Sequence, residues 1–171
     1  MSSLWFLRAA IQEQMPIMVI DKNTAYIDFT QSFEEATDLH LVQAEMATQA
    51  LLNRHAGGPD SLVVLQKLYG KDAYPKAQQL IREEKSEFAI KQIQQKSHIL
   101  TNRVLQLRND SVTAEVTGQL IRTGVFADEV FVELLEFTLN LNFVRNPKLR
   151  ENGRYPSVVV DFELKTQPVV K

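Results

Sequence analysis

Residues 112–120 have the sequence Val-Thr-Ala-Glu-Val-Thr-Gly-Gln-Leu, in which apolar and polar positions alternate. A period of two residues is typical of a β-strand that buries one face and leaves the other wetter. The same period predicts strands at 131–143 and 157–164, and a weaker one at 98–107. Because only short polar segments separate these four runs, the sequence predicts an antiparallel meander of four strands.

The segment before the strands has helical periodicity. Ser32 and Glu35 have the spacing of a capping box, which satisfies free N–H groups at the start of a helix. Apolar side chains then recur at helical spacing until Gly57-Gly58-Pro59, which predicts the end of the helix. Two further helices are expected at 61–69 and 72–88. Helices first and strands afterwards predict an α+β domain, with N-terminal helices packed on the four-stranded antiparallel sheet.

The first thirty residues differ in character from the rest of the chain. We expect residues 1–30 to form a separate segment and residues 31–171 to form a single α+β domain. The stretch 17–29 holds two β-rich runs around a polar turn, which predicts a short N-terminal β-hairpin. Trp5 and Phe6 lie in a stretch that is apolar on several sides, so it needs a partner: the domain core, a second subunit or a membrane-directed segment.

The composition limits the classes of function. Lys and Arg total 19 and Asp and Glu total 21, a balance that argues against a dedicated nucleic-acid binder. The absence of Cys excludes thiol catalysis, disulfides and zinc ribbons. No histidine or carboxylate pair has the spacing of metal ligands, and Glu83-Glu84 is expected on a solvated helix face, so no cofactor or metal is expected. No apolar run approaches the roughly 20 residues of a membrane-spanning helix.

The last sixty residues carry a family resemblance. Val116–Leu120 leads through Thr123–Phe126 to Phe137–Leu141, and Asn152–Arg154 then precedes Val159–Phe162. This pattern resembles the periplasmic domain of TraE-type conjugation proteins and of the related eighth VirB protein. The order of helices and strands also resembles the cone-shaped fold of the nuclear transport factor 2 superfamily.

The resemblance implies a curved sheet and a non-enzymatic assembly or scaffold component of a type IV secretion or conjugation apparatus. Members of that family self-associate and contact other channel proteins. The expected partners are therefore further copies of this chain, in a dimer or higher oligomer, and other secretion-channel proteins, with no nucleic acid. Family members stand on the periplasmic side of the inner membrane through a membrane segment that is absent from this chain. Without the family match, the cytoplasm would be expected.

A second hypothesis is a small-molecule dehydratase or isomerase of the same superfold. Enzymes of this superfold place a His and an Asp in the cavity of the cone, and His98 with Asp161 is the candidate catalytic pair here. A third hypothesis is a binding protein whose cavity holds a ligand without chemistry. Either function needs an open pocket, whereas a scaffold can fill the cavity with the side chains of Phe131, Phe137, Leu139 and Phe143.

The two other histidines have structural explanations. His40 falls on the apolar side of its helix, which predicts a packed and hydrogen-bonded core histidine. His55 precedes Gly57, where an exposed histidine at the C-terminus of a helix complements the helix dipole.

Four cations gather on the loop before the last strand: Arg145, Lys148, Arg150 and Arg154. They favour docking of an acidic partner surface, and a solvated loop with Glu151 among the cations is the alternative. Together with Trp5 and Phe6, these four are the candidate interaction residues.

Overall fold

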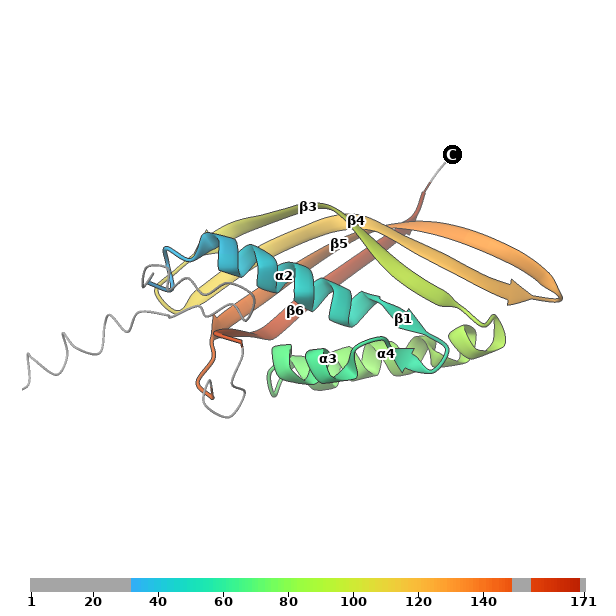
Figure 1. Ribbon diagram of the computed structural model, residues 1–171, viewed down its shortest axis with the longest axis horizontal. Helices are drawn as coiled ribbons and strands as arrows, with labels where there is room; N and C mark the ends of the chain where they lie inside the picture. Colours follow the sequence, from blue (N-terminus) through green and yellow to red (C-terminus); the bar gives the residue numbers. More distant parts are fainter. Residues whose placement is uncertain (1–31, 149–154, 170–171) are drawn as a thin grey trace, which may run out of the picture.

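The computed structural model describes residues 32–148 and 155–169 (Figure 1). Its helices are α2 (Thr37–Leu52), α3 (Leu62–Leu68) and α4 (Ala73–Ile90). Its strands are β1 (Arg54–His55), β2 (Gly58–Pro59), β3 (Gln94–Leu107), β4 (Ser111–Phe126), β5 (Glu129–Arg145) and β6 (Ser157–Pro168). All three helices pack against one curled antiparallel sheet, which confirms the predicted α+β class.

The sheet has six strands in the order β2-β1-β3-β4-β5-β6, and the predicted count of four was too low. The four long strands form the predicted meander. The two extra strands come from the segment predicted only as a helix stop: Arg54 pairs with Pro59 on β2 and with Gln95 on β3. Gly58 has a φ of 128°, a conformation that favours glycine, so the helix stop also folds into a hairpin. The N-terminal hairpin predicted over 17–29 lies outside the described residues.

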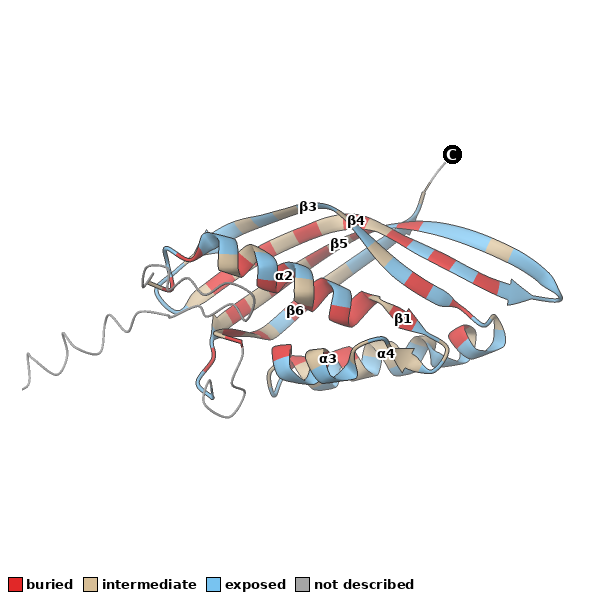
Figure 2. Ribbon diagram, viewed as in Figure 1, coloured by how far each residue is buried: buried red, intermediate tan, exposed pale blue. Residues whose placement is uncertain are grey.

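The alternating sequence of β4 places its two sets of side chains on opposite faces of the sheet. The apolar set Val112, Ala114, Val116 and Leu120 is buried beneath the helices (Figure 2). Phe137, Leu139 and Phe143 of β5 lie on the same buried face, because Gly118 pairs with Phe137 and Val116 pairs with Leu139. The helix layer therefore covers one face of the sheet, and this face is the hydrophobic core.

The end of α3 is anchored between α2 and β6. The buried Tyr69 hydroxyl donates to the Ala47 carbonyl of α2 at 3.0 Å, and its ring meets Phe162 edge-on at 5.6 Å. The Gly70 N–H donates to the Val159 carbonyl at 2.8 Å. Burial raises the pKa of Tyr69, so its hydroxyl keeps its proton and remains a donor at ordinary pH.

The predicted capping box forms, but it precedes the helix. The Ser32 N–H donates to the Glu35 carboxylate at 3.1 Å and the Glu35 N–H donates to Ser32 Oγ at 3.3 Å, while α2 begins at Thr37. These hydrogen bonds hold the pKa of Glu35 below its usual value. They close a turn that directs the buried Phe33 against the helix.

Gly118 lies where β3 and β4 approach most tightly. The β3–β4 register shifts between Ile99 and Thr101, so Leu100 is an extra residue opposite a continuous β4. A Cβ atom on Gly118 would lie 2.1 Å from the His98 carbonyl oxygen and 2.9 Å from the Phe137 ring. Glycine is therefore required at this apolar position of the alternating pattern.

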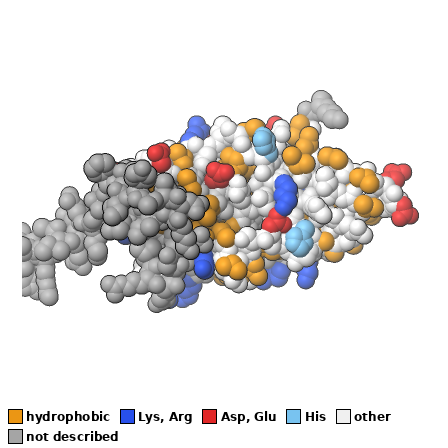
Figure 3. Space-filling model, viewed as in Figure 1, with side chains coloured by type: hydrophobic (Ala, Val, Ile, Leu, Met, Phe, Trp, Pro, Cys, Tyr) orange, Lys and Arg blue, Asp and Glu red, His pale blue; other side chains and the backbone are white. Residues whose placement is uncertain are grey.

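The ends of β4 and β5 project beyond the rest of the sheet as a two-stranded arm (Figure 1). Pairing of β5 with β6 ends at Leu135, whereas pairing of β5 with β4 continues to Glu129. Ala127 and Asp128 close the arm with φ values of 51° and 63°, the backbone of a two-residue hairpin turn. Figure 3 shows hydrophobic side chains along this end of the molecule and acidic ones at its tip.

His40 is buried, as its sequence position predicted. Its Nε2 lies 2.7 Å from the Phe33 carbonyl oxygen, which accepts a hydrogen bond from the neutral ring. Nδ1 has no partner among the described residues. Burial lowers the pKa of His40 below its ordinary 6.5, although the hydrogen bond to the Phe33 carbonyl opposes this shift.

The buried His40 predicts a pH dependence of stability. Between the lowered pKa of the folded protein and 6.5, the unfolded chain binds more protons than the folded one. The free energy of unfolding is therefore expected to fall as the pH is lowered through 6.5, by at most about 1.4 kcal/mol per pH unit. Glu35, Glu87 and Asp161 have lowered pKa values, so their contributions are lost only at lower pH, below their ordinary values of 4.5 and 3.8.

Urea unfolding of the His40→Gln variant between pH 7 and pH 5 checks this expectation. We expect the variant to lose the slope in this range, whatever its stability at pH 7. The matched variant His55→Gln, at an exposed histidine, is expected to keep the slope. An equal slope in His40→Gln and the wild type would show that another group is responsible.

Candidate functional site

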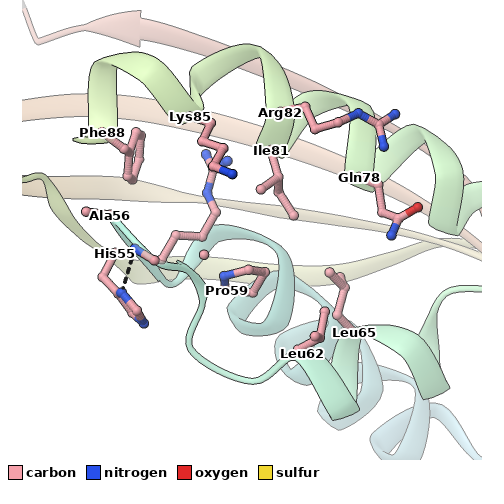
Figure 4. A pocket seen from close by; sticks show the side chains of 13 residues that line it. His55, Ala56, Pro59, Leu62, Leu65, Gln78, Ile81, Arg82, Lys85 and Phe88 are labelled. Carbon is pink, nitrogen blue, oxygen red and sulfur yellow. Dashed lines mark hydrogen bonds between the residues drawn. The ribbon is translucent and has the colours of Figure 1, made fainter. Parts of the chain in front are cut away.

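A groove of about 320 Å³ lies between α4 and the segment that runs from β1 to α3 (Figure 4). One wall is a single stripe of α4, since the residues that line it recur at helical spacing: Gln78, Ile81, Arg82, Lys85 and Phe88. The other wall is formed by the β1–β2 hairpin, residues 54–59, and by Leu62 and Leu65 of α3. We call this feature the α4 groove.

The lining of the α4 groove is apolar at its base and positively charged around it. Leu65 and Phe88 are buried, and Leu62 is 47% exposed. Arg54, Arg82 and Lys85 supply cationic groups, and among the described residues no carboxylate lines the groove. The arrangement can hold an apolar group and a negatively charged group side by side.

A buried ionic network fixes the wall that α4 provides. Glu84 accepts hydrogen bonds from Arg54 of β1 and, at 2.8 Å, from Arg122 of β4. Arg122 Nε also donates to Gln95 Oε1 at 2.6 Å, and Gln95 Nε2 donates to the Leu52 carbonyl at 2.7 Å. The three side chains Arg54, Gln95 and Arg122 are buried, and the network thereby ties α4 to three strands and to the end of α2.

The aromatic ring of Phe88 also contacts the two arginines of this network. The guanidinium carbons of Arg54 and Arg122 lie 5.0 and 5.4 Å from the centroid of its ring, within the range of cation–π attraction. The Glu84 carboxylate and the Phe88 ring of α4 thus contact both buried cations, and the Glu133 carboxylate of β5 lies 3.6 Å from Arg122. The expectation of a solvated Glu83-Glu84 face is therefore wrong for Glu84, whose side chain is 27% exposed.

Arg54 belongs to both the network and the α4 groove. Its side chain is 3% exposed and it lines the groove, yet its Nε–H has no acceptor among the described residues. A buried donor without an acceptor is costly, because the interior does not replace its lost hydrogen bond to water. This unmet donor belongs to the buried network, because the Nε atom itself is not accessible from solvent.

The candidate catalytic pair is not brought together by the fold. His98 on β3 and Asp161 on β6 are both exposed, and β4 and β5 lie between their strands. The strand register also places His98 level with Gln167, which is about 20 Å along β6 from Asp161. The Asp161 carboxylate instead pairs with Lys76 Nζ of α4 at 2.8 Å, which holds its pKa below the usual value.

The buried side of the sheet is filled with side chains. Phe137, Leu139 and Phe143 are fully buried in the core, and Phe131, farther out on the arm, is partly exposed. In the part of the chain that the structure describes, no group of three His, Asp or Glu side chains could hold a metal ion.

The predicted interaction residues fall at one end of β5 or outside the described residues. The Arg145 guanidinium lies 5.3 Å above the Phe33 ring, and the Lys148 N–H donates to Asn146 Oδ1 at 2.9 Å. Both side chains are exposed. Trp5, Phe6, Arg150 and Arg154 lie outside the described residues.

Sequence reasoning missed the α4 groove, although one signal was present. Ile81, Arg82 and Lys85 share a face of the predicted third helix with Phe88, and a cationic stripe on an apolar helix face is unusual for a purely solvated surface. The opposite wall had no signal, because the short β1–β2 hairpin has no periodicity.

The arrangement of three helices on one face of a curled antiparallel sheet is similar in fold to VirB8-like periplasmic domains of type IV secretion systems. The Agrobacterium tumefaciens VirB8 protein superposes with a TM-score of 0.56 and 10% identity, over 84% of this chain and 100% of that one. The periplasmic domain of DotI gives a TM-score of 0.53 and 12% identity, over 81% and 98%. CagV, a VirB8 homolog from Helicobacter pylori, gives 0.53 and 10%, over 75% and 98%.

The similarity to these proteins lies in the three-dimensional fold and not in the sequence. No protein-family model matches the chain, and no curated protein sequence matches it. The resemblance proposed from the strand motifs is thus confirmed by structural similarity. Across residues 32–148 and 155–169, none of the helices combines the length and the apolar character needed to cross a membrane.

Proposed function

We propose that this chain is a non-enzymatic assembly component of a type IV secretion or conjugation apparatus. One observation carries the proposal: the fold matches nearly the whole length of several periplasmic domains of such systems, including 100% of the VirB8 chain and 98% of the DotI domain. The chain would act on the periplasmic side of the inner membrane, through self-association and through contacts with other channel proteins.

The packing of the described residues supports a scaffold. Phe137, Leu139 and Phe143 occupy the space in which an enzyme of this superfold would need an open pocket. The position of His98 on β3 and Asp161 on β6, with β4 and β5 between them, also favours a scaffold over an enzyme that uses this pair.

The proposal also assigns a role to the parts of the chain. Residues 31–171 form the assembly domain, and residues 1–30 form a separate segment in which Trp5 and Phe6 pack against another subunit. Arg145, Lys148, Arg150 and Arg154 form a docking site for an acidic surface of a neighbouring channel protein, which steers association through charge.

Gene deletion in the native host tests the proposal. We expect deletion to reduce conjugative transfer or effector secretion to background, and we expect the wild-type gene to restore it. The variant with both His98→Ala and Asp161→Ala is expected to restore transfer equally, because a scaffold does not need this pair. Unchanged transfer after deletion would contradict the proposal, and so would failure of the double variant at a normal protein level.

A further inference from the structure

We propose that the α4 groove binds a peptide segment of a partner protein that combines a carboxylate with a neighbouring large apolar side chain. The proposal concerns binding alone and stands whether or not the chain serves a secretion system. It is carried by two features of the groove: the cations Arg82 and Lys85, and the apolar base.

The cations around the α4 groove are available to a ligand. Neither Arg82 nor Lys85 has an ion-pair partner among the described residues. Several cations elsewhere are already paired: Lys76 with Asp161, Lys96 with Asp60, Arg103 with Glu115 and Lys165 with Glu163. With no carboxylate among the residues that line it, the groove has a local positive charge on a chain whose net charge is −2. Its charge complements an acidic ligand.

A carboxylate that enters the groove can accept hydrogen bonds from Arg82 and Lys85, whose exposed side chains line it. Such charge-assisted hydrogen bonds are stronger than those between neutral groups. Arg54 does not take part, because its buried guanidinium donates to Glu84 and its Nε is not accessible from solvent.

The apolar base calls for an apolar side chain beside that carboxylate. Leu62, Leu65, Ile81 and Phe88 would cover a Leu- or Phe-sized group, and a volume of about 320 Å³ is enough for one or two side chains. A membrane surface is a poor fit, because these groups line a concavity between α4 and the β1–β2 hairpin rather than a protruding face (Figure 4). A short peptide brings both kinds of group into the concavity at once.

Selection from a random octapeptide library on the full-length chain tests the proposal. We expect the enriched peptides to carry Asp or Glu within two positions of Leu, Ile or Phe. The affinities of synthetic copies are then measured by fluorescence anisotropy for the wild type and for the variant with Arg82→Glu and Lys85→Glu. We expect about tenfold weaker binding or more for this variant, because two attractive charges become repulsive.

A matched variant controls for net charge. Arg103→Glu with Lys165→Glu makes the same change in net charge on exposed strand positions away from the groove, and it is expected to bind like the wild type. Circular dichroism checks that both variants are folded. Equal binding by all three proteins, or enrichment of basic or wholly neutral peptides, would overturn the proposal.

Two further outcomes would assign the groove to another occupant. A change in particle mass of the Arg82→Glu, Lys85→Glu variant would identify the groove as a contact between copies of this chain. Loss of binding to phosphatidylglycerol vesicles, with peptide binding unaffected, would identify a membrane contact. Either result overturns the peptide assignment and leaves the transfer test of the proposed function untouched.

Discussion

Replacement of Glu84 by Gln is expected to lower the free energy of unfolding by about 3 kcal/mol. Glu84 is the carboxylate that neutralises Arg54 and Arg122, whose side chains are 3% and 9% exposed. Gln can accept a hydrogen bond from one guanidinium, but its NH₂ group then faces the other, and two buried positive charges remain. Urea unfolding followed by far-UV circular dichroism measures the change.

The neighbouring residue provides the control. Glu83 lies on the same helix, is exposed and accepts a hydrogen bond from Gln79, its one side-chain partner among the described residues. Glu83→Gln is therefore expected to change stability by less than about 0.5 kcal/mol. A loss below about 1 kcal/mol for Glu84→Gln would mean that water or Glu133, whose carboxylate lies 3.6 Å from Arg122, neutralises the network instead.

Replacement of Gly118 by Val is expected to cost about 3 kcal/mol or more. A Cβ atom at this position meets the backbone oxygen of His98 at 2.1 Å, and a backbone atom cannot move aside as the end of a side chain can. The two strands must separate at the β3 register shift, which also displaces the Phe137 ring from the core. Thermal and urea unfolding give the size of the loss.

Gly57→Ala is the matched glycine control. A Cβ atom on Gly57 would approach only the exposed His55 ring, at 2.8 Å, and this ring can rotate away. We expect a loss below about 1 kcal/mol. If Gly118→Val were as stable as Gly57→Ala, β3 and β4 would have to lie farther apart at Gly118 than the structure places them.

The sequence patterns predicted the four long strands of the sheet but not the two short strands, β1 and β2, at one edge. The alternation at 112–120 identified both the strand and its buried face, because a long half-buried strand repeats the same choice many times. The β1–β2 hairpin was missed, because strands of two residues offer no repeat to recognise. The pairing of β1 with Gln94 and Gln95 of β3 joins residues about 40 positions apart in the sequence, which no local pattern encodes.

The candidate sites depended on contacts that no local pattern encodes. Glu84 has the spacing of a solvated helix face, yet its two partners lie 30 and 38 residues away in sequence. The His98–Asp161 hypothesis could have been weakened from the sequence alone. The first and fourth strands of a meander lie three spacings apart unless the sheet closes on itself.

The order of the elements along the chain has a consequence for how the protein is made. The helices are synthesised first, but β6, the last strand, completes their contacts: Gln43 bonds with Ser157, the Gly70 N–H with Val159 and Lys76 with Asp161. Contacts of such large sequence separation form late. While the strands are still being made, the apolar faces of α2 and α3 have no cover from the sheet. The helix layer therefore reaches its final packing only after the residues of β6 have left the ribosome.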